Sequence, residues 1–271
     1  MAGSVLNQIV DNVYVLNLSR DSFKYDILAK KLGELEIEHE RFIGTDGKSP
    51  EFTGGLNGTG FGKVYRSSGA IGCLVSHINI LEDAVEKKYN KILLLQDDIY
   101  FHQNFEALLG GFLPMIESSD GFYLGASEWS KTQRDRCKDG LWEEGSVQGT
   151  YGKSLVYKTT PKTYGLFGLI LGSRTFEDIL KLMKCYFNAA DQAVAAVLGS
   201  GFSRTSLVAY PNLIIPDTGE SDTWSDNTLG KFNKLIHESG EQNEKRPLED
   251  HSKMMGWDTT KYDLTNRYYN T

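Results

Sequence analysis

The chain has 271 residues, of which 40% are hydrophobic, and this is enough to bury the core of one large α/β domain. Its 29 basic and 36 acidic residues give a net charge of −7, and no run of lysine or arginine stands out, which argues against a nucleic-acid partner. No segment approaches about 18 consecutive apolar residues, and the first residues lack the pattern of a secretory signal. We therefore expect a cytoplasmic protein without a membrane span.

The cysteines give no sign of a disulfide framework or a zinc site. Cys73, Cys137 and Cys185 are odd in number, and none belongs to a C-x-x-C pair. We therefore expect free thiols that are mostly buried.

The first part of the chain predicts a strand, a helix and a second strand. Residues 13–18 are a β-branched and apolar run, and the apolar residues that follow recur at helical spacing as far as residue 35. Residues 38–43 predict a second strand, which ends at the turn signal Thr45-Asp46-Gly47. Residues 44–63 are rich in glycine and lack periodicity, so we expect a loop there.

A helix and a buried strand come next. Apolar residues between 74 and 85 recur at three- and four-residue spacing, which predicts an amphipathic helix that ends near residue 88. Residues 92–95 are apolar without interruption, as is typical of a strand buried on both faces of a parallel sheet. Asp97 and Asp98 follow this strand almost at once.

The rest of the chain continues to alternate between strands and helices. Strands are predicted at 122–126, 166–171 and 206–210, and helices from residue 176 and near Asp191. The pattern predicts an α/β fold with a mostly parallel, Rossmann-type sheet flanked by helices. Beyond Pro216 the sequence is polar and weakly periodic. We therefore divide the chain into a domain of residues 1–215 and an extension of residues 216–271 that packs on or covers it.

The strongest chemical signal is Gln96-Asp97-Asp98 at the carboxyl end of the buried strand. In open α/β sheets, ligands bind in the crevice beyond the carboxyl ends of the strands. Two adjacent carboxylates at that place are hard oxygen ligands, which suit Mn²⁺ or Mg²⁺ when the phosphates of a substrate complete the shell. The alternative is that one of the aspartates only caps the next element.

Ser76 and His77 are expected at the beginning of the helix that precedes this strand. At a helix start, the hydroxyl and imidazole groups could direct donors at a phosphate or a sugar hydroxyl, helped by the positive end of the helix. The alternative is that Ser76 is a plain N-cap.

A set of motifs follows one another in a fixed order along residues 13–222. The central ones are Gly69-Ala-Ile-Gly72-Cys-Leu-Val-Ser76-His77, a helix, and Leu95-Gln96-Asp97-Asp98. Together they resemble glycosyltransferase family 25, whose pattern is Gly-x-x-Gly-Cys-x-x-Ser-His, a helix and a strand ending in Glu-Asp-Asp. That family includes lipooligosaccharide and procollagen galactosyltransferases. Further segments resemble its opening and its second half: the first strand with Arg20, Asp46-Gly47, Tyr164-Gly165, Asp191, and Tyr210-Pro211 to Ser221-Asp222.

The resemblance implies a GT-A-like single domain, a UDP-sugar donor and an inverting transfer. It implies a metal held by Asp98 and Gln96, and a nucleotide site lined by Asn17, Arg20, Asp46, Gly72, Ser76, His77 and Asp97. One position departs from the family, because Gln96 stands where the family carries Glu, which keeps a carbonyl acceptor and loses a negative charge. Weaker metal binding, an altered metal preference or loss of activity would each follow.

An inverting displacement needs a carboxylate that takes the proton from the acceptor hydroxyl. Asp191 is the first candidate, and its alternative role is to cap the helix that follows it. Glu128 is the competing candidate, because it comes just after a predicted strand and beside a tryptophan.

Two functions of different classes are therefore expected from the sequence. The first is a metal-dependent inverting hexosyltransferase, which moves galactose or glucose from a UDP-sugar to a hydroxyl of a glycan or protein-linked acceptor. The second is a non-catalytic binding or scaffold protein of the same fold, in which Gln96 replaces an acidic residue and the metal-dependent activity has been lost. Titration of UDP with and without Mn²⁺ discriminates between them.

Overall fold

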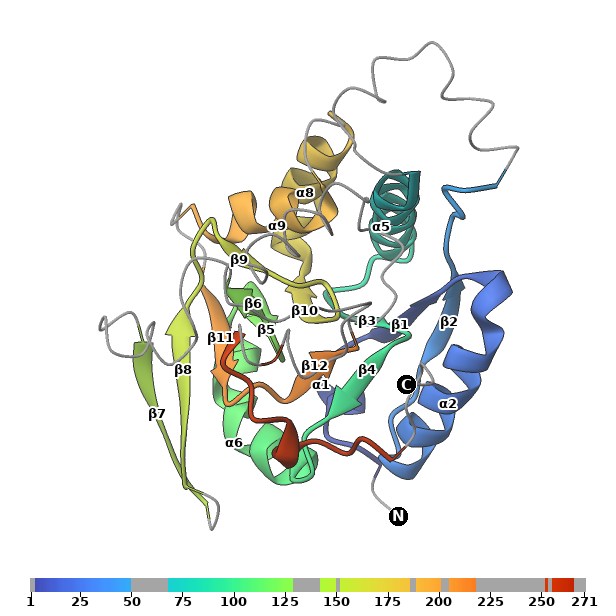
Figure 1. The fold of residues 1–271 in the computed structure, drawn as a ribbon. Coiled ribbons are helices and arrows are strands. Elements are labelled where there is room, and N and C mark those ends of the chain that lie inside the picture. Colours follow the sequence, from blue (N-terminus) through green and yellow to red (C-terminus); the bar gives the residue numbers. More distant parts are fainter. Residues whose placement is uncertain are drawn as a thin grey trace, which may run out of the picture.

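The computed structural model describes residues 3–49, 68–128, 142–149, 152–185, 189–200, 205–217, 252 and 255–265. Its centre is an eight-stranded sheet in the order β2-β1-β3-β10-β5-β11-β8-β7 (Figure 1). In chain order these strands are β1 (Asn12–Asn17), β2 (Glu40–Ile43), β3 (Lys91–Gln96), β5 (Gly121–Tyr123), β7 (Trp142–Gly149), β8 (Gly152–Lys158), β10 (Gly168–Gly172) and β11 (Ser206–Tyr210).

Most strands of this sheet run in one direction. β1 is parallel to β2 and β3, and β5 is parallel to β11. β10 lies antiparallel between β3 and β5, and β8 lies antiparallel between β11 and β7. The reversed strands are therefore β8 and β10, and the carboxyl ends of β1 and β3 meet at one edge of the sheet.

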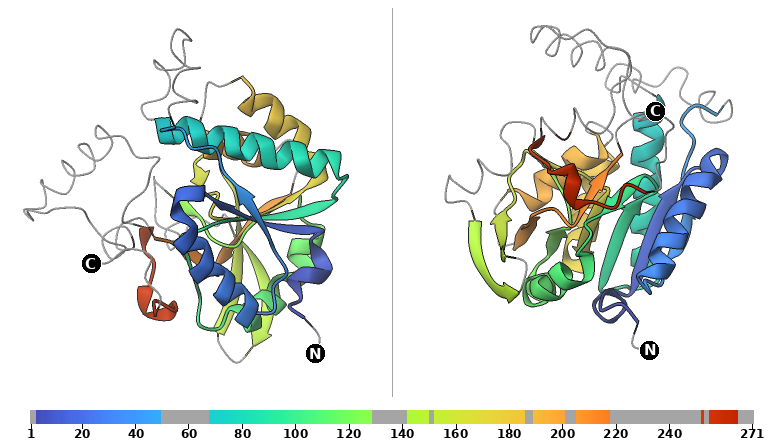
Figure 2. Two further views of the ribbon diagram at one scale, coloured as in Figure 1. Left: turned by 90° about the vertical axis from the view of Figure 1, so that its right-hand side faces the viewer. Right: turned by 60° about the horizontal axis from the view of Figure 1, so that its bottom comes forward.

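Helices cover both faces of the sheet (Figures 1 and 2). One face carries α2 (Ser22–Glu34) and α6 (Phe105–Ser118), with the short α1 (Leu6–Ile9) before β1. The other face carries α5 (Ser68–Glu86), α8 (Phe176–Met183) and α9 (Ala190–Leu198). The strands contribute side chains to the hydrophobic core on both faces of the sheet. Val13 and Val15 are buried on the α2 side, whereas Tyr14 between them is buried on the α5 side. This two-sided burial explains the uninterrupted apolar runs in the sequence.

Two small ladders lie next to the main sheet. β12 (Ile214–Pro216) is antiparallel to β4 (Ile99–Phe101), which directly follows the segment with Asp97 and Asp98. β6 (Ser127–Glu128) is antiparallel to β9 (Thr163–Tyr164).

Residues 255–265, here called the C-terminal segment, pack on the α6 side of the sheet. Trp257 and Tyr262 are buried in the core on this side. The Tyr262 hydroxyl donates a hydrogen bond of 2.7 Å to the carbonyl of Asn212, and the N–H of Asp263 donates one of 3.0 Å to the carbonyl of Phe101. The C-terminal segment therefore ties together parts of the chain that are distant in sequence.

The predicted α/β architecture is confirmed, and the differences lie in particular elements. The sequence pattern does not predict α6, because Gly110, Gly111 and Pro114 interrupt its helical signal, but burial of its apolar face holds the helix in place. The polar stretch between the predicted strands at 122–126 and 166–171 contains the β7–β8 hairpin.

Two further expectations can be compared with the structure. The expectation of buried thiols is wrong for Cys185, which is exposed, while Cys73 is half-buried and Cys137 lies outside the described residues. Of the predicted loop at 44–63, only residues 44–49 are described. No helix in the described part of the chain has the length and apolar character to cross a bilayer.

Candidate functional site

The carboxyl ends of β1 and β3 bring two polar segments together. Asn17 is the last residue of β1, and Asp97 and Asp98 follow Gln96, the last residue of β3. Because Leu16 is paired with Gln96, Asn17 lies beside Asp97, and its side-chain amide donates a hydrogen bond of 2.5 Å to Asp97 Oδ2. This is the edge of the sheet where α/β proteins bind their ligands.

Asp97 and Asp98 are poorly solvated carboxyl groups. Burial raises the pKa of both, and the charge of Asp97 raises the pKa of Asp98 further. Lys24 of α2, which is 8% exposed, lowers the pKa of both groups through its positive charge. Burial outweighs the attraction of Lys24, so the pKa of both carboxyl groups stays above its ordinary value.

A third carboxyl group comes from a distant part of the chain. Asp217 follows β12, and its N–H donates a hydrogen bond of 2.6 Å to the carbonyl of Asp98. Its buried carboxylate accepts a hydrogen bond of 2.5 Å from the Tyr100 hydroxyl, and its charge is a further cause of the raised pKa of Asp98. Within the described ranges, no three His, Cys, Asp or Glu side chains are grouped in a way that could hold a metal ion.

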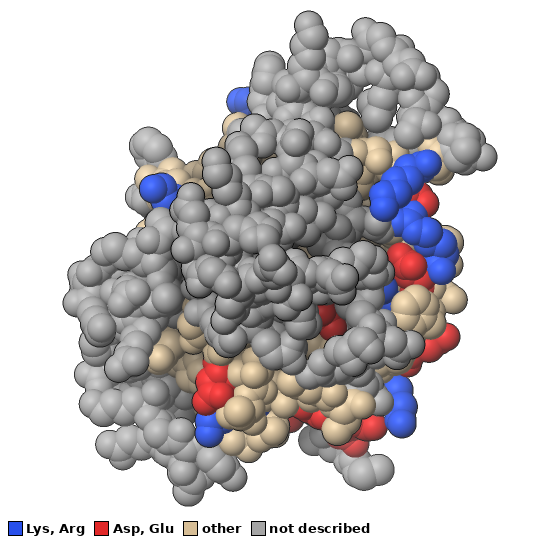
Figure 3. Space-filling model, in the orientation of Figure 1, with Lys and Arg blue, Asp and Glu red and all other residues tan. Residues whose placement is uncertain are grey.

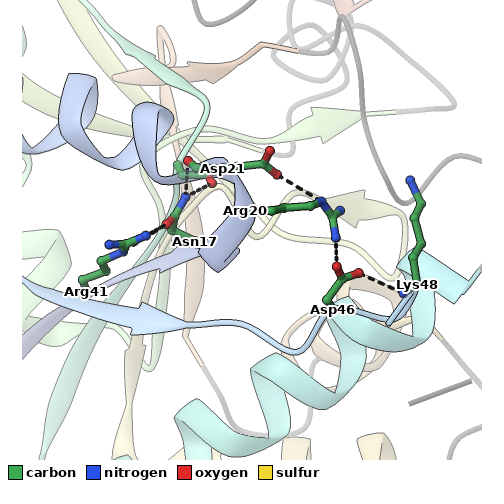
Figure 4. Close-up of polar contacts among 7 residues, drawn as sticks. Asn17, Arg20, Asp21, Arg41, Asp46 and Lys48 are labelled. Atoms are coloured by element: carbon green, nitrogen blue, oxygen red, sulfur yellow. Dashed lines mark hydrogen bonds and ion pairs between the residues drawn. The ribbon is translucent and has the colours of Figure 1, made fainter. Parts of the chain in front are cut away.

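Arg20 and Asp46 form an ion pair beside this edge (Figure 4). Arg20 lies in the 3-10 turn Ser19–Asp21 after β1, and Asp46 lies in the loop after β2. The guanidinium group donates to Asp46 Oδ2 and lowers the pKa of this carboxyl group, while the N–H of Lys48 donates to Oδ1 at 2.9 Å. Figure 3 shows basic side chains next to acidic ones near the end of β2.

Gly72 and Ser76 hold this loop against α5. The Ser76 hydroxyl donates to the carbonyl of Gly72 at 2.7 Å and accepts a hydrogen bond of 2.8 Å from the N–H of Thr45. A Cβ atom on Gly72 would lie 2.6 Å from both the nitrogen of Gly47 and the oxygen of Thr45. The two residues are one helical turn apart and therefore form a single docking face for residues 45–47.

The expected position of Ser76 and His77 at the start of the helix is wrong. α5 includes Ser68, so both residues lie in its middle, and Ser76 is not an N-cap. The glycines and serines before residue 74 weaken the helical signal, but packing on the loop compensates for their low propensity. Neither residue can therefore use the positive end of the helix to bind an anion.

His77 is buried and belongs to the interior of α5. It is 1% exposed, and its Nδ1 donates to the carbonyl of Cys73 at 2.8 Å. Burial lowers the pKa of His77, so the ring is neutral at physiological pH. Its assignment to the nucleotide site stays a prediction.

Asp191 lies on α9, which packs against α5 on the same face of the sheet. It is the second residue of α9, so its alternative role as the N-cap is wrong. Burial raises the pKa of Asp191, and its Oδ1 accepts a hydrogen bond of 2.8 Å from the N–H of Gln192. The pKa of the Cys73 thiol is raised to about 12 by burial first and then by the charges of Asp191 and Asp98. The charges of both carboxyl groups therefore act on Cys73 of α5.

Glu128, the competing base, lies on β6, where its backbone is opposite Thr163 of β9. The side chain of Glu128 is outside the described part of the structure. Its role also stays a prediction.

Comparison with known proteins places the chain in a family. The family model described as glycosyltransferase family 25 (LPS biosynthesis protein) matches residues 10–193. The chain belongs to glycosyltransferase family 25. Procollagen galactosyltransferase 2 of Homo sapiens is 27% identical over 255 residues, which cover 81% of this chain and 39% of that protein. The protein of the same name from Mus musculus is 23% identical over 250 residues, with the same coverage of both chains.

Some relatives carry a different name. The inactive glycosyltransferase 25 family member 3 of Homo sapiens is 24% identical and covers 86% of this chain and 42% of that protein. The chain therefore spans about two fifths of the length of these curated relatives.

Several motifs that suggest family 25 have a structural explanation in this member. Gly72 and Ser76 seat the loop with Asp46, as described above. Gly165 has a φ of +118°, and a Cβ atom there would lie 2.5 Å from the Phe167 ring, so glycine is required for both reasons. Ser221 and Asp222 lie outside the described residues.

Sequence reasoning missed three charged residues at this family 25 site: Lys24, Arg41 and Asp217. Asp217 follows the apolar run Ile214-Ile215-Pro216, which is the same signal that identified Asp97, but it falls just outside the expected domain. Lys24 and Arg41 have no local signal, because their place in the site depends on tertiary contacts.

Proposed function

We propose that this chain transfers a hexose from a UDP-sugar to a hydroxyl group of a glycan or protein-linked acceptor, with inversion and with the help of Mn²⁺ or Mg²⁺. The observation that carries the proposal is the pair Asp97 and Asp98 at the carboxyl end of β3, in a chain of family 25. Galactose is the favoured hexose, because the relatives with 23% and 27% identity are named galactosyltransferases.

Two residues of the site are proposed as oxygen ligands of a hard divalent cation. Asp98 is partly buried beside Asp97 and Asp217, and burial first and then the charges of these two carboxylates raise the pKa of Asp98. Asp98 would hold the cation, Gln96 could add a neutral oxygen, and the two phosphates of the donor would complete the shell. The bound cation would offset the negative charge that develops on the leaving diphosphate.

Other side chains of the protein are proposed to accept the proton and to bind the nucleotide. Asp191 is our proposed base, because its partly buried carboxyl group has a raised pKa, which increases its affinity for a proton. Arg20, which is paired with Asp46, would contact the nucleotide. Glu128 is the second candidate for the base.

Titration of UDP into the protein, with and without Mn²⁺, tests the proposal. We expect Mn²⁺ to tighten UDP binding in the wild type and to have no effect in Asp98→Asn, because the substitution removes the charged ligand. The matched control is Asp26→Asn, which changes an exposed aspartate of α2 and should behave as the wild type. Equal effects of Mn²⁺ in the wild type and Asp98→Asn would contradict the proposed metal site.

A second function is favoured by one position and by some relatives. Gln96 removes a negative charge, and relatives with 24% identity are named inactive. A non-catalytic protein would bind UDP without an effect of Mn²⁺ and would not turn over any UDP-hexose. In an active enzyme, Gln96→Glu should strengthen metal affinity and preserve turnover.

A further inference from the structure

The side chain of Asn17 has its hydrogen-bonding capacity filled by the protein. It is 1% exposed, and its Nδ2 donates to Asp97 Oδ2 at 2.5 Å and to the carbonyl of Asp21 at 2.9 Å. Its Oδ1 accepts from Arg41 at 3.0 Å from Nε and at 2.5 Å from a terminal nitrogen. A side-chain amide has two N–H groups and two lone pairs, so no group is left for a bound nucleotide.

Arg41 and the carbonyl of Asp21 together determine which way this amide faces. A guanidinium group can only donate, so the oxygen of Asn17 must face Arg41 and the NH₂ group must face Asp97. Arg41 is itself held by two elements, because it lies on β2 and its guanidinium carbon is 4.8 Å from the centre of the Tyr25 ring in α2. Figure 4 shows Arg41 and Asn17 pointing toward each other, with Asp21 on the far side of Asn17.

We propose that Arg41 and Asn17 form a positioning relay that sets the orientation of the Asp97 carboxylate. This inference rests on the proposed function, and it assigns Asp97 to the hydroxyl groups of the transferred sugar. It assigns Asn17 a new role, as a positioning residue in place of a nucleotide ligand. It also explains why a partly buried arginine contacts a neutral amide, since a bidentate donor fixes the amide more firmly than a single hydrogen bond does.

The first test separates turnover from nucleotide affinity. In Arg41→Met we expect turnover of the preferred UDP-hexose to fall about 10²-fold, the cost of a misplaced catalytic group. UDP affinity should stay within about twofold, because the relay acts on the transferred sugar and not on the nucleotide. Arg41→Lys keeps one donor and should recover part of the turnover. Arg174→Met removes an exposed arginine paired with Asp120 and serves as the matched control.

A double-mutant cycle tests whether Arg41 acts through Asn17. Asn17→Ala and the double variant Asn17→Ala/Arg41→Met should have equal turnover, because Arg41 has nothing left to orient. If the losses of turnover in the two single variants multiply in the double variant, Arg41 acts independently of Asn17, and this would overturn the relay. A parallel loss of UDP affinity and turnover in Arg41→Met would also overturn it.

A third measurement does not depend on activity, so it separates failure of the relay from failure of the proposed function. In ¹⁵N NMR spectra, the side-chain NH₂ signals of Asn17 should be protected from solvent exchange in the wild type and should lose this protection in Arg41→Met. Protection that is unchanged in Arg41→Met would overturn the relay, even if the wild type turns over no donor. Lost protection in a protein without turnover would support the relay and reject the proposed transfer.

Discussion

At the scale of single residues, Asp191 combines two properties of a general base. It lies at the start of α9, which packs against α5, and burial raises its pKa. If it accepts the proton of the acceptor hydroxyl, Asp191→Asn should lower the transfer rate about 10²–10⁴-fold, with UDP affinity near that of the wild type. Rates can be measured by release of UDP from the UDP-hexose in the presence of acceptor.

The matched control for this prediction is Asp178→Asn. Asp178 occupies the first turn of α8 as Asp191 does that of α9, but it is exposed. This variant should keep the wild-type rate. If Asp191→Asn keeps it as well, the base lies elsewhere, and Glu128 becomes the first candidate.

The sequence could predict residues that follow a recognisable strand end, such as Asp97 and Asp98. It could not predict the local role of Ser76, because the partner of its hydroxyl is the N–H of Thr45, 31 positions away. For the same reason it did not find Arg41, whose partner Asn17 lies 24 positions away on another strand. Contacts between side chains of different elements decide these roles, and a pattern along one chain does not contain them.

At the scale of elements, the contact between α5 and residues 45–47 depends on the absence of a side chain. In Gly72→Ala the new Cβ would meet the backbone of Gly47 and Thr45 at 2.6 Å, so the loop must move. We expect a loss of about 1–3 kcal/mol in the free energy of unfolding, measured by urea denaturation, as for other overpacked sites.

The control is Gly110→Ala, which changes a helical glycine of α6 with no atom within 4 Å of the added Cβ. It should stabilise the protein by about 0.5–1 kcal/mol, because alanine is the better helix former. A Gly72→Ala variant that is as stable as the wild type would show that the loop is not held at this point.

Elements whose apolar residues recur at regular spacing could be predicted from the sequence. Elements that are stabilised mainly by packing against other parts of the chain could not. β1, β3 and the second half of α5 have such a period, and their positions agree with the prediction. The first turns of α5 and the whole of α6 contain glycine, serine or proline, which hide a helix that packing stabilises.

At the scale of the whole molecule, the C-terminal segment is joined to α2 by an ion pair that depends on pH. Lys31 donates to Asp263 at 2.9 Å, and the hydroxyl of Thr265 donates to the same carboxylate at 2.6 Å. These bonds lower the pKa of Asp263 to about 2. Because this is below the unfolded value of about 3.9, the contribution is present at neutral pH and is lost as the pH falls from about 4 toward 2.

We therefore expect Asp263→Asn to lower the free energy of unfolding by about 1 kcal/mol at pH 6, a value reduced by the partial exposure of both partners. The difference from the wild type should shrink at pH 3, as measured by urea denaturation at both pH values. Glu34→Gln removes the more exposed partner of Lys31, at 3.3 Å, and should change stability by less than about 0.5 kcal/mol. A difference that does not change with pH would contradict the role of the Asp263 charge.

The place of β10 in the sheet has a consequence for how the protein is made. β10 separates β2, β1 and β3 from β5, β11, β8 and β7, yet it follows β5, β7 and β8 in the chain. On the ribosome, the facing edges of β3 and β5 therefore emerge without the strand that pairs with both. Unpaired apolar edges of this kind are the surfaces that aggregate or recruit chaperones in nascent chains. Asp191 and Asp217 are translated later still, so the site is assembled only after residue 217 has been translated.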